Sequence, residues 1–105
     1  MTDDDRRRHE TRARILKAMA HPSRLFILEK LSERPHCVCE LTELIGSDTS
    51  TVSKHLSVLK NAGIISDRKR GTMVFYSLET PCVLGYLSCV QQVVEQHIGR
   101  LLPRG

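Results

Sequence analysis

Apolar residues recur every three or four positions along most of the chain, and this spacing predicts a mostly helical protein. The pattern predicts helices over residues 3–20, 22–34, a short segment ending at Gly46, 50–61 and about 81–102. Three of these helices carry short apolar stripes. We expect Leu25, Leu28 and Leu31 in the core, Leu41, Leu44 and Ile45 on one face of their helix, and Val52, Leu56 and Leu59 to face inward. The last helix carries a longer stripe: Val83, Leu87, Val90, Val94, Ile98 and Leu101.

A tight turn separates the third and fourth predicted helices. Gly46 suits the left-handed backbone conformation that ends many helices, and Ser47, Asp48 and Thr49 are typical turn and N-cap residues. A gap of three or four residues between two helices is the spacing of a helix-turn-helix. We therefore expect the fourth helix to pack across the third.

Two runs of β-prone residues follow the fourth helix. Ile64–Ser66 and Met73–Leu78 are separated by the polar segment Asp67–Thr72, which predicts a hairpin with a basic tip. The predicted fold class is therefore mainly α with a small β-hairpin.

The composition limits the class of protein. A chain of 105 residues holds one domain with one core, which we take to span residues 1–105. No segment resembles a signal peptide, and no apolar run approaches the ~18 residues of a membrane span. We expect a cytoplasmic protein without membrane contact. The net charge of +4 favours a polyanionic partner if the positive residues cluster.

The fourth helix has the pattern of a helix that reads DNA. A major groove admits one helix, whose inner face must be held by the core and whose outer face bears short polar or basic side chains. The residues expected to reach bases and phosphates are Ser50, Thr51, Ser53, Lys54 and His55, with Arg68, Lys69 and Arg70 of the hairpin tip on the backbone or minor groove. Of the other histidines, we expect His21 at a helix boundary and His36 to be exposed or a spare ligand.

Four cysteines in a reducing compartment indicate thiols with a chemical role or buried packing rather than structural disulfides. Side chains two residues apart, such as Cys37 and Cys39, share a side in an extended segment but lie about 200° apart on a helix. They can hold one ion only if the chain is not yet helical there. Cys82 and Cys89 lie roughly 10 Å apart if both are helical, so at most one of them joins that pair. Soft thiolates select Cu(I), Zn, Cd-like ions and trivalent arsenic.

The chain resembles the ArsR/SmtB family of metal-responsive repressors over nearly its whole length. Four stretches carry the resemblance: Ala18–Leu25, Cys37–Leu41, Val52–Leu59 and the hairpin Asp67–Tyr76. The resemblance implies a winged helix-turn-helix homodimer, joined through the first and last helices (about 3–20 and 81–102), that blocks operator DNA until an inducer binds. The long apolar stripe of the last helix independently favours a partner subunit.

The Cys-Val-Cys-Glu-Leu run resembles the arsenite and antimonite sensors of that family, in which three sulfurs take the ion. Thr42 stands where a third nearby cysteine is expected. The resemblance therefore implies arsenite or antimonite as inducer and no organic cofactor, with a third sulfur from Cys89 or Cys82 of either subunit.

Other functions remain open at this point. The same fold could sense Cd, Zn or Pb, or respond to oxidants and reactive sulfur through a disulfide or polysulfide that joins Cys37 or Cys39 to Cys82 or Cys89. A thiol oxidoreductase is disfavoured because the chain lacks Cys-x-x-Cys and a βαβ pattern, so we expect no enzyme. A protein-interaction module that has lost DNA binding is the third class.

Overall fold

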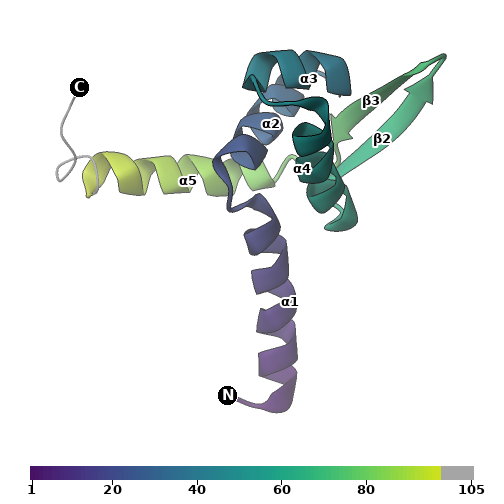
Figure 1. The fold of residues 1–105 in the computed structure, drawn as a ribbon. Coiled ribbons are helices and arrows are strands. Elements are labelled where there is room, and N and C mark those ends of the chain that lie inside the picture. Colours follow the sequence, from purple (N-terminus) through teal and green to yellow (C-terminus); the bar gives the residue numbers. More distant parts are fainter. Residues whose placement is uncertain (98–105) are drawn as a thin grey trace.

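The computed structural model describes residues 1–97, which form five helices and three short strands. Figure 1 shows how the helices and the long hairpin are arranged. The elements are α1 (Asp3–Met19), α2 (Pro22–Glu33), β1 (His36–Cys37), α3 (Val38–Ile45), α4 (Thr49–Asn61), β2 (Ile65–Arg70), β3 (Met73–Leu78) and α5 (Val83–Gln96). The predicted mainly helical fold with a small hairpin is confirmed. No helix of the described part is long and apolar enough to cross a membrane.

Local signals in the sequence account for most helix ends. At the start of α1, the Thr2 hydroxyl accepts a hydrogen bond from the Asp5 amide at 3.1 Å, and the Asp5 carboxylate accepts one from the Thr2 amide at 3.1 Å. Pro22 opens α2, where a first-turn proline loses no helical hydrogen bond. Gly46 ends α3 with φ of 82°, a conformation that glycine adopts without steric cost.

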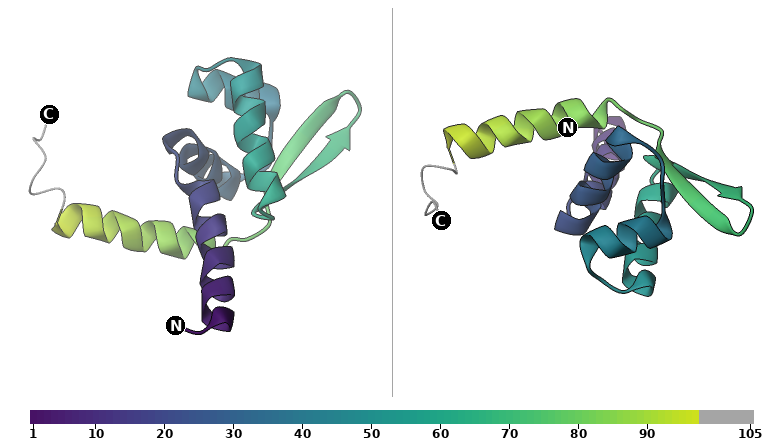
Figure 2. Two further views of the ribbon diagram at one scale, coloured as in Figure 1. Left: turned by 60° about the horizontal axis from the view of Figure 1, so that its bottom comes forward. Right: turned by 90° about the horizontal axis from the view of Figure 1, so that it is seen from above.

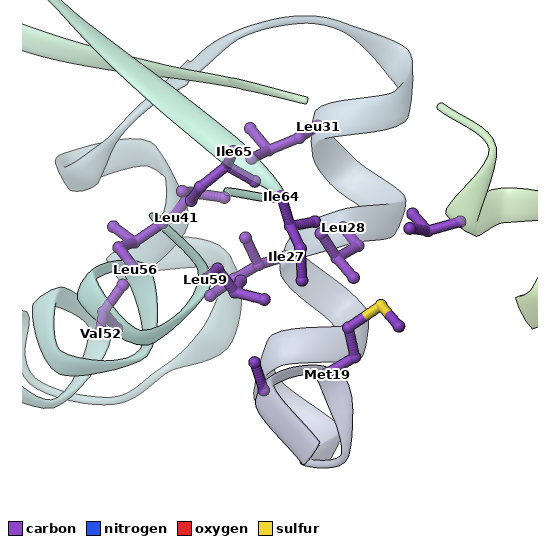
Figure 3. Close-up of a cluster of buried hydrophobic side chains, with 12 residues drawn as sticks. Met19, Ile27, Leu28, Leu31, Leu41, Val52, Leu56, Leu59, Ile64 and Ile65 are labelled. Carbon is purple, nitrogen blue, oxygen red and sulfur yellow. The ribbon is translucent and has the colours of Figure 1, made fainter. Parts of the chain in front are cut away.

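The core lies where α2, α3 and α4 meet the base of the hairpin (Figure 3). Val52, Leu56 and Leu59 of α4 are completely buried, as their spacing predicts. The other members of the core cluster are Ala18, Met19, Ile27, Leu28, Leu31, Leu41, Ile64, Ile65 and Val83. The prediction that Leu25 is core is wrong for the single chain, because Leu25 is 37% exposed, and Leu44 is 50% exposed although it shares a face with Leu41.

The three strands form an antiparallel sheet in the order β1-β3-β2. The predicted polar turn Asp67–Thr72 is wrong in extent, since β2 continues to Arg70 and only Gly71 and Thr72 remain between the strands. Pairing with β3 supplies ladder hydrogen bonds that composition does not reveal. The sequence also gave no signal for β1, whose two residues are strand only because His36 pairs with Tyr76 and Cys37 with Phe75.

The last helix is shorter than its apolar pattern predicts. It begins at Val83 rather than at Thr80 or Pro81, because residues 80–82 form a turn in which the Val83 amide donates to the Thr80 carbonyl at 3.1 Å. It ends at Gln96. The rest of the predicted helix to Leu102, with Ile98 and Leu101, lies outside the described residues.

Helices α1 and α5 extend away from the core in different directions (Figures 1 and 2). The radius of gyration is 15.9 Å, whereas a compact domain of this length has about 13 Å. Much of the apolar stripe of α5 is therefore uncovered, with Val90 56% and Val93 49% exposed, and Leu16 of α1 is 51% exposed. The single chain leaves a large apolar surface in water.

We expect Leu56→Ala to lower the free energy of unfolding by about 2–5 kcal/mol, because it removes fully buried atoms and leaves a cavity. Val58→Ala on the same helix, where the side chain is 36% exposed, is the control and should cost no more than about 1 kcal/mol. Urea denaturation at one fixed protein concentration measures both. Equal losses in the two variants would contradict this description of the core.

Candidate nucleic-acid interface and thiol site

The outward face of α4 carries the polar residues that the sequence analysis assigned to DNA. Asp48 caps the helix, since its carboxylate accepts a hydrogen bond from the Thr51 amide at 2.8 Å. Hydrogen bonds from Thr51 lower the pKa of the Asp48 carboxyl, so the capping group is ionised at neutral pH. Ser50, Thr51 and Lys54 are exposed on the side opposite the buried stripe. They form a free polar surface at the beginning of the helix.

Ser53 and His55 are placed differently from the other predicted α4 residues. Both are only half-exposed. Ser53 lines a groove between α4 and the hairpin. His55 turns toward the α1–α2 junction, where its Nδ1 accepts a hydrogen bond from Nε of Arg24 at 3.2 Å. The ring nitrogen left for other contacts is therefore Nε2.

The hairpin of β2 and β3 forms a wing beside α4, and its Arg68, Lys69 and Arg70 are exposed (Figure 1). Neighbouring residues of a strand face opposite sides, so Arg68 and Arg70 share one face and Lys69 lies on the other. The Arg70 guanidinium lies 5.9 Å from the centroid of the Phe75 ring, a cation–π distance.

An ion pair ties the base of the wing to the end of α4. Nζ of Lys60 lies 2.9 Å from Oδ2 of Asp67, and the hydrogen bond to Asp67 raises the pKa of Lys60. At an exposed site such a pair contributes little stability, but it joins the two elements that carry the basic and polar residues. The wing and α4 are therefore linked as well as adjacent.

Cys37 and Cys39 come together at the point where β1 becomes α3. Cys37 is extended, with φ of −82° and ψ of 163°, and Cys39 lies in the first helical turn. The two sulfur atoms are joined as a disulfide, and the Cα atoms lie 5.4 Å apart. The chain is therefore not yet helical at Cys37, as the binding of one ion by both Cys37 and Cys39 requires. Cys37 is buried, whereas Cys39 is exposed to reagents.

Glu40 and Arg34 hold the cysteine segment in place. The Glu40 carboxylate accepts hydrogen bonds from the Cys37 amide at 3.2 Å and from the Arg34 guanidinium at 2.7 Å. These two donors lower the pKa of Glu40, with the Arg34 hydrogen bond as the larger cause. Neither residue was predicted from the sequence to have a role. An acidic residue three positions after the N-cap is a recognisable capping signal, whereas Arg34 had none.

The cysteine pair is attached to the wing. Cys37 pairs with Phe75 of β3, so the segment that carries the thiols is part of the same sheet as the basic hairpin. A groove of about 380 Å³ lies beside the pair, and its lining is Cys37, Val38, Cys39, Ser53, Thr72, Met73, Val74 and Tyr76. The groove thus touches α3, α4 and the wing at once.

The other predicted ligands do not join this pair within one chain. Cys82 precedes α5 and Cys89 lies on it, and both are free and exposed. Among residues 1–97, no three His, Cys, Asp or Glu side chains are grouped so that they could hold a metal. The prediction that His36 is exposed is wrong, because the residue is only 2% exposed. Its Nδ1 lies 2.8 Å from the Arg34 carbonyl oxygen, and its role as a spare ligand stays a prediction.

Residues 21–67 match the sequence model of the bacterial regulatory proteins of the arsR family. An uncharacterised HTH-type transcriptional regulator of Methanocaldococcus jannaschii is 43% identical over 70 residues, which are 66% of this chain and 79% of the relative. A cadmium resistance transcriptional regulatory protein, a CadC homolog of Staphylococcus aureus, is 44% identical over 68 residues, 64% of this chain and 56% of that protein.

The fold is similar to that of a homodimeric winged helix-turn-helix DNA-binding domain from Mycobacterium bovis, described as a possible ArsR-family regulator. The TM-score is 0.79 with 27% sequence identity, and the match covers 100% of this chain and 97% of that one. The wing and the two packed helices are therefore those of a winged helix-turn-helix.

The lowered pKa of Glu40 predicts an acid-sensitive contribution to stability. In the unfolded chain the carboxyl has its ordinary pKa of 4.5, and the folded value is lower. The contribution is therefore present above that ordinary pKa and is lost as the pH falls through the folded pKa. We expect Glu40→Gln to lower the urea midpoint at neutral pH and to flatten its decline in acid.

Glu43→Gln, an exposed change on the same helix, is the control for Glu40→Gln and should leave the acid profile as it is in the unmodified protein. Urea midpoints measured across the acid range compare the three proteins. Identical profiles for all three would show that Glu40 does not hold the cysteine segment.

Proposed function

The chain belongs to the arsR family of bacterial regulatory proteins, and we propose that it is a repressor that releases operator DNA when arsenite or antimonite binds Cys37 and Cys39. The family consists of transcriptional regulators, in agreement with the prediction that the chain is not an enzyme. One observation carries the proposal: the thiol segment is a strand of the wing sheet, through the pairing of Cys37 with Phe75.

The exposed residues of α4 and of the wing are the proposed DNA contacts. Ser50, Thr51 and Lys54 lie on the helix face that the core leaves free, which is the face that enters a major groove in helix-turn-helix proteins. The basic wing tip then contacts phosphates or a minor groove beside that helix. Ser53 lies at the edge of this face and lines the groove beside Cys37 and Cys39.

A second copy of the chain is the proposed partner of α1 and α5. Leu16, Tyr86, Val90 and Val93 on these helices are exposed apolar side chains, and burying such surface is the main favourable term in subunit association. The homodimeric Mycobacterium bovis domain of the same fold supports this assignment. Two copies also present two reading helices, as symmetric operators require.

Arsenite binding needs the pair in its reduced form. Each thiol that replaces a hydroxyl group of arsenious acid forms one As–S bond and releases one water, so two cysteines satisfy two of the three arsenic valences. Because no third thiol lines the groove of the described chain, the proposed third donor is Cys89 or Cys82 of the second copy. Sulfur ligation of this kind favours soft ions over hard cations.

We expect the protein to release DNA because the ion and the DNA favour different conformations of it. Ligation that repositions Cys37 also repositions β1 and therefore β3, because the strands share hydrogen bonds. If the ion binds more tightly to the conformation in which the wing is displaced, it lowers the affinity for DNA, and DNA lowers the affinity for the ion by the same factor. The groove beside α4 and the wing is where this coupling originates.

Two other inducers have specific support. The disulfide joins Cys37 to Cys39 rather than either of them to Cys82 or Cys89, as the oxidation alternative expected. It favours release by oxidants or reactive sulfur, which would change the same strand without any ion. The Staphylococcus aureus relative is named for cadmium resistance, so Cd, with Zn and Pb, is the alternative set of ions. Both alternatives use the same cysteine pair.

We expect Arg68→Ala and Arg70→Ala each to weaken binding to all DNA sequences and to reduce the slope of log affinity against log salt by about 0.9, because each loses one phosphate contact. Lys54→Ala should weaken operator binding most. Fluorescence anisotropy at several salt concentrations measures these effects. Arg6→Ala, at the far end of α1, is the charge-matched control; a slope unchanged in both wing variants would refute the wing contact.

We expect Cys37→Ser and Cys39→Ser proteins to bind operator DNA normally but to remain bound when arsenite or antimonite is added under reducing conditions. DNA release during titration of the reduced protein is the measurement, with Cd, Zn and an oxidant as separate titrants. Cys82→Ser and Cys89→Ser identify the third donor, since only its loss should weaken the arsenite response. If arsenite still releases DNA from the Cys37→Ser/Cys39→Ser protein, the proposal is refuted.

A further inference from the structure

Side chains from two distant parts of the sequence meet where α1, α2 and α4 join: His21 and Arg24 at the start of α2, and His55 of α4. Arg24 of α2 donates from Nε to Nδ1 of His55 at 3.2 Å and from a terminal nitrogen to the Ala18 carbonyl of α1 at 3.1 Å. The His21 ring, at the start of α2, packs against the His55 ring with centroids 4.3 Å apart. One guanidinium thus connects the end of α1 to the middle of α4.

These contacts require an unprotonated imidazole at His55. Nδ1 accepts the Arg24 hydrogen bond, so the ring proton must lie on Nε2 and the ring is neutral. The His21 ring is also an acceptor, since its Nδ1 takes a hydrogen bond from the Ser23 amide at 3.1 Å. A proton on Nδ1 of His55 would remove the acceptor and place a positive ring beside a guanidinium.

The surroundings of His55 are positively charged. Burial lowers the pKa of His55, and the neighbouring His21 and Arg24 lower it further. From α1, Arg14 and Lys17 line the same groove as Arg24. On α4 itself the adjacent Lys54 is exposed. Among residues 1–97, the charged groups that shift the pKa of His55 are His21 and Arg24, and both oppose its protonation.

We propose that Arg24 and His21 are positioning residues that hold α4 in its reading position through unprotonated His55, so that mild acid releases the helix and weakens operator binding. His55 then acts through the placement of α4 rather than through a base contact. The effect on DNA rests on the proposed contact of α4 with the operator. The release of α4 is a property of the free protein and is measured separately.

The direction of the pH effect follows from linkage. The pKa of His55 in the folded protein lies below the ordinary value of 6.5. A group with a lowered folded pKa stabilises the fold above its unfolded pKa, and this contribution is lost as the pH falls through the folded value. The hold on α4 is therefore complete above that ordinary value and weakens below it.

The test compares four proteins by operator affinity and by amide hydrogen exchange of α4, each as a function of pH. We expect the operator affinity of the unmodified protein to fall about tenfold from about pH 7.5 to about pH 5.5, the effect of losing one hydrogen bond to a charged donor. Over the same range, amide exchange in α4 should become faster after correction for the pH dependence of the intrinsic exchange rate. His55→Asn keeps an acceptor in place of Nδ1 but cannot be protonated in this range, so both profiles should flatten.

Arg24→Gln removes one donor and the charge, so affinity should fall at neutral pH and α4 should exchange faster at every pH. His9→Asn, an exposed histidine of α1, is the matched control and should behave as the unmodified protein.

The proposal is overturned if His55→Asn keeps the pH dependence of the unmodified protein, or if Arg24→Gln matches the unmodified protein in affinity and exchange. A protein that binds no operator at any pH would refute the proposed function instead. In that case the exchange of α4 still decides the positioning role.

Discussion

Val52, Leu56 and Leu59 are completely removed from solvent on one side of α4, and this burial fixes the direction of the opposite side. A helix with a buried stripe cannot rotate about its axis without exposing that stripe to water. The polar residues at the start of α4 are therefore held outward, beside the wing. The proposed response to protons acts on this helix, and the proposed response of the thiols acts on the sheet beside it.

The helix is held from two sides by different means. On one side Arg24 ties it to α2 and α1 by directed hydrogen bonds to His55 and to the Ala18 carbonyl. On the other side the ion pair of Lys60 with Asp67 joins its end to the wing, whose sheet includes the cysteine segment. In our proposals the first attachment responds to protons, and the second joins α4 to the sheet that carries the thiols. Either signal would then reach the proposed DNA-facing surface over a short path.

Much of this architecture was predictable because its causes are local. The ends of α3 and α4 follow from Gly46 and Asp48, and the inner face of α4 follows from spacing alone. The approach of Cys37 to Cys39 followed from the rule that two-residue spacing brings side chains together only in extended chain. The errors have non-local causes. β1 exists through its pairing with β3, and Leu25 is 37% exposed in an open groove that it lines with Leu84 and Leu87 of α5.

The sequence by itself determined which segments are helical, which face of α4 is apolar, and that two soft sulfur atoms lie at the start of α3, because periodicity, capping and short spacings act between near neighbours. Only the tertiary structure decided that Cys37 belongs to the wing sheet and that His55 faces Arg24 across 31 positions. Such contacts depend on how helices cross and how strands align, and no local pattern encodes a partner so far along the chain. The distant contacts are the ones that connect the proposed sensing groups to the proposed reading surface.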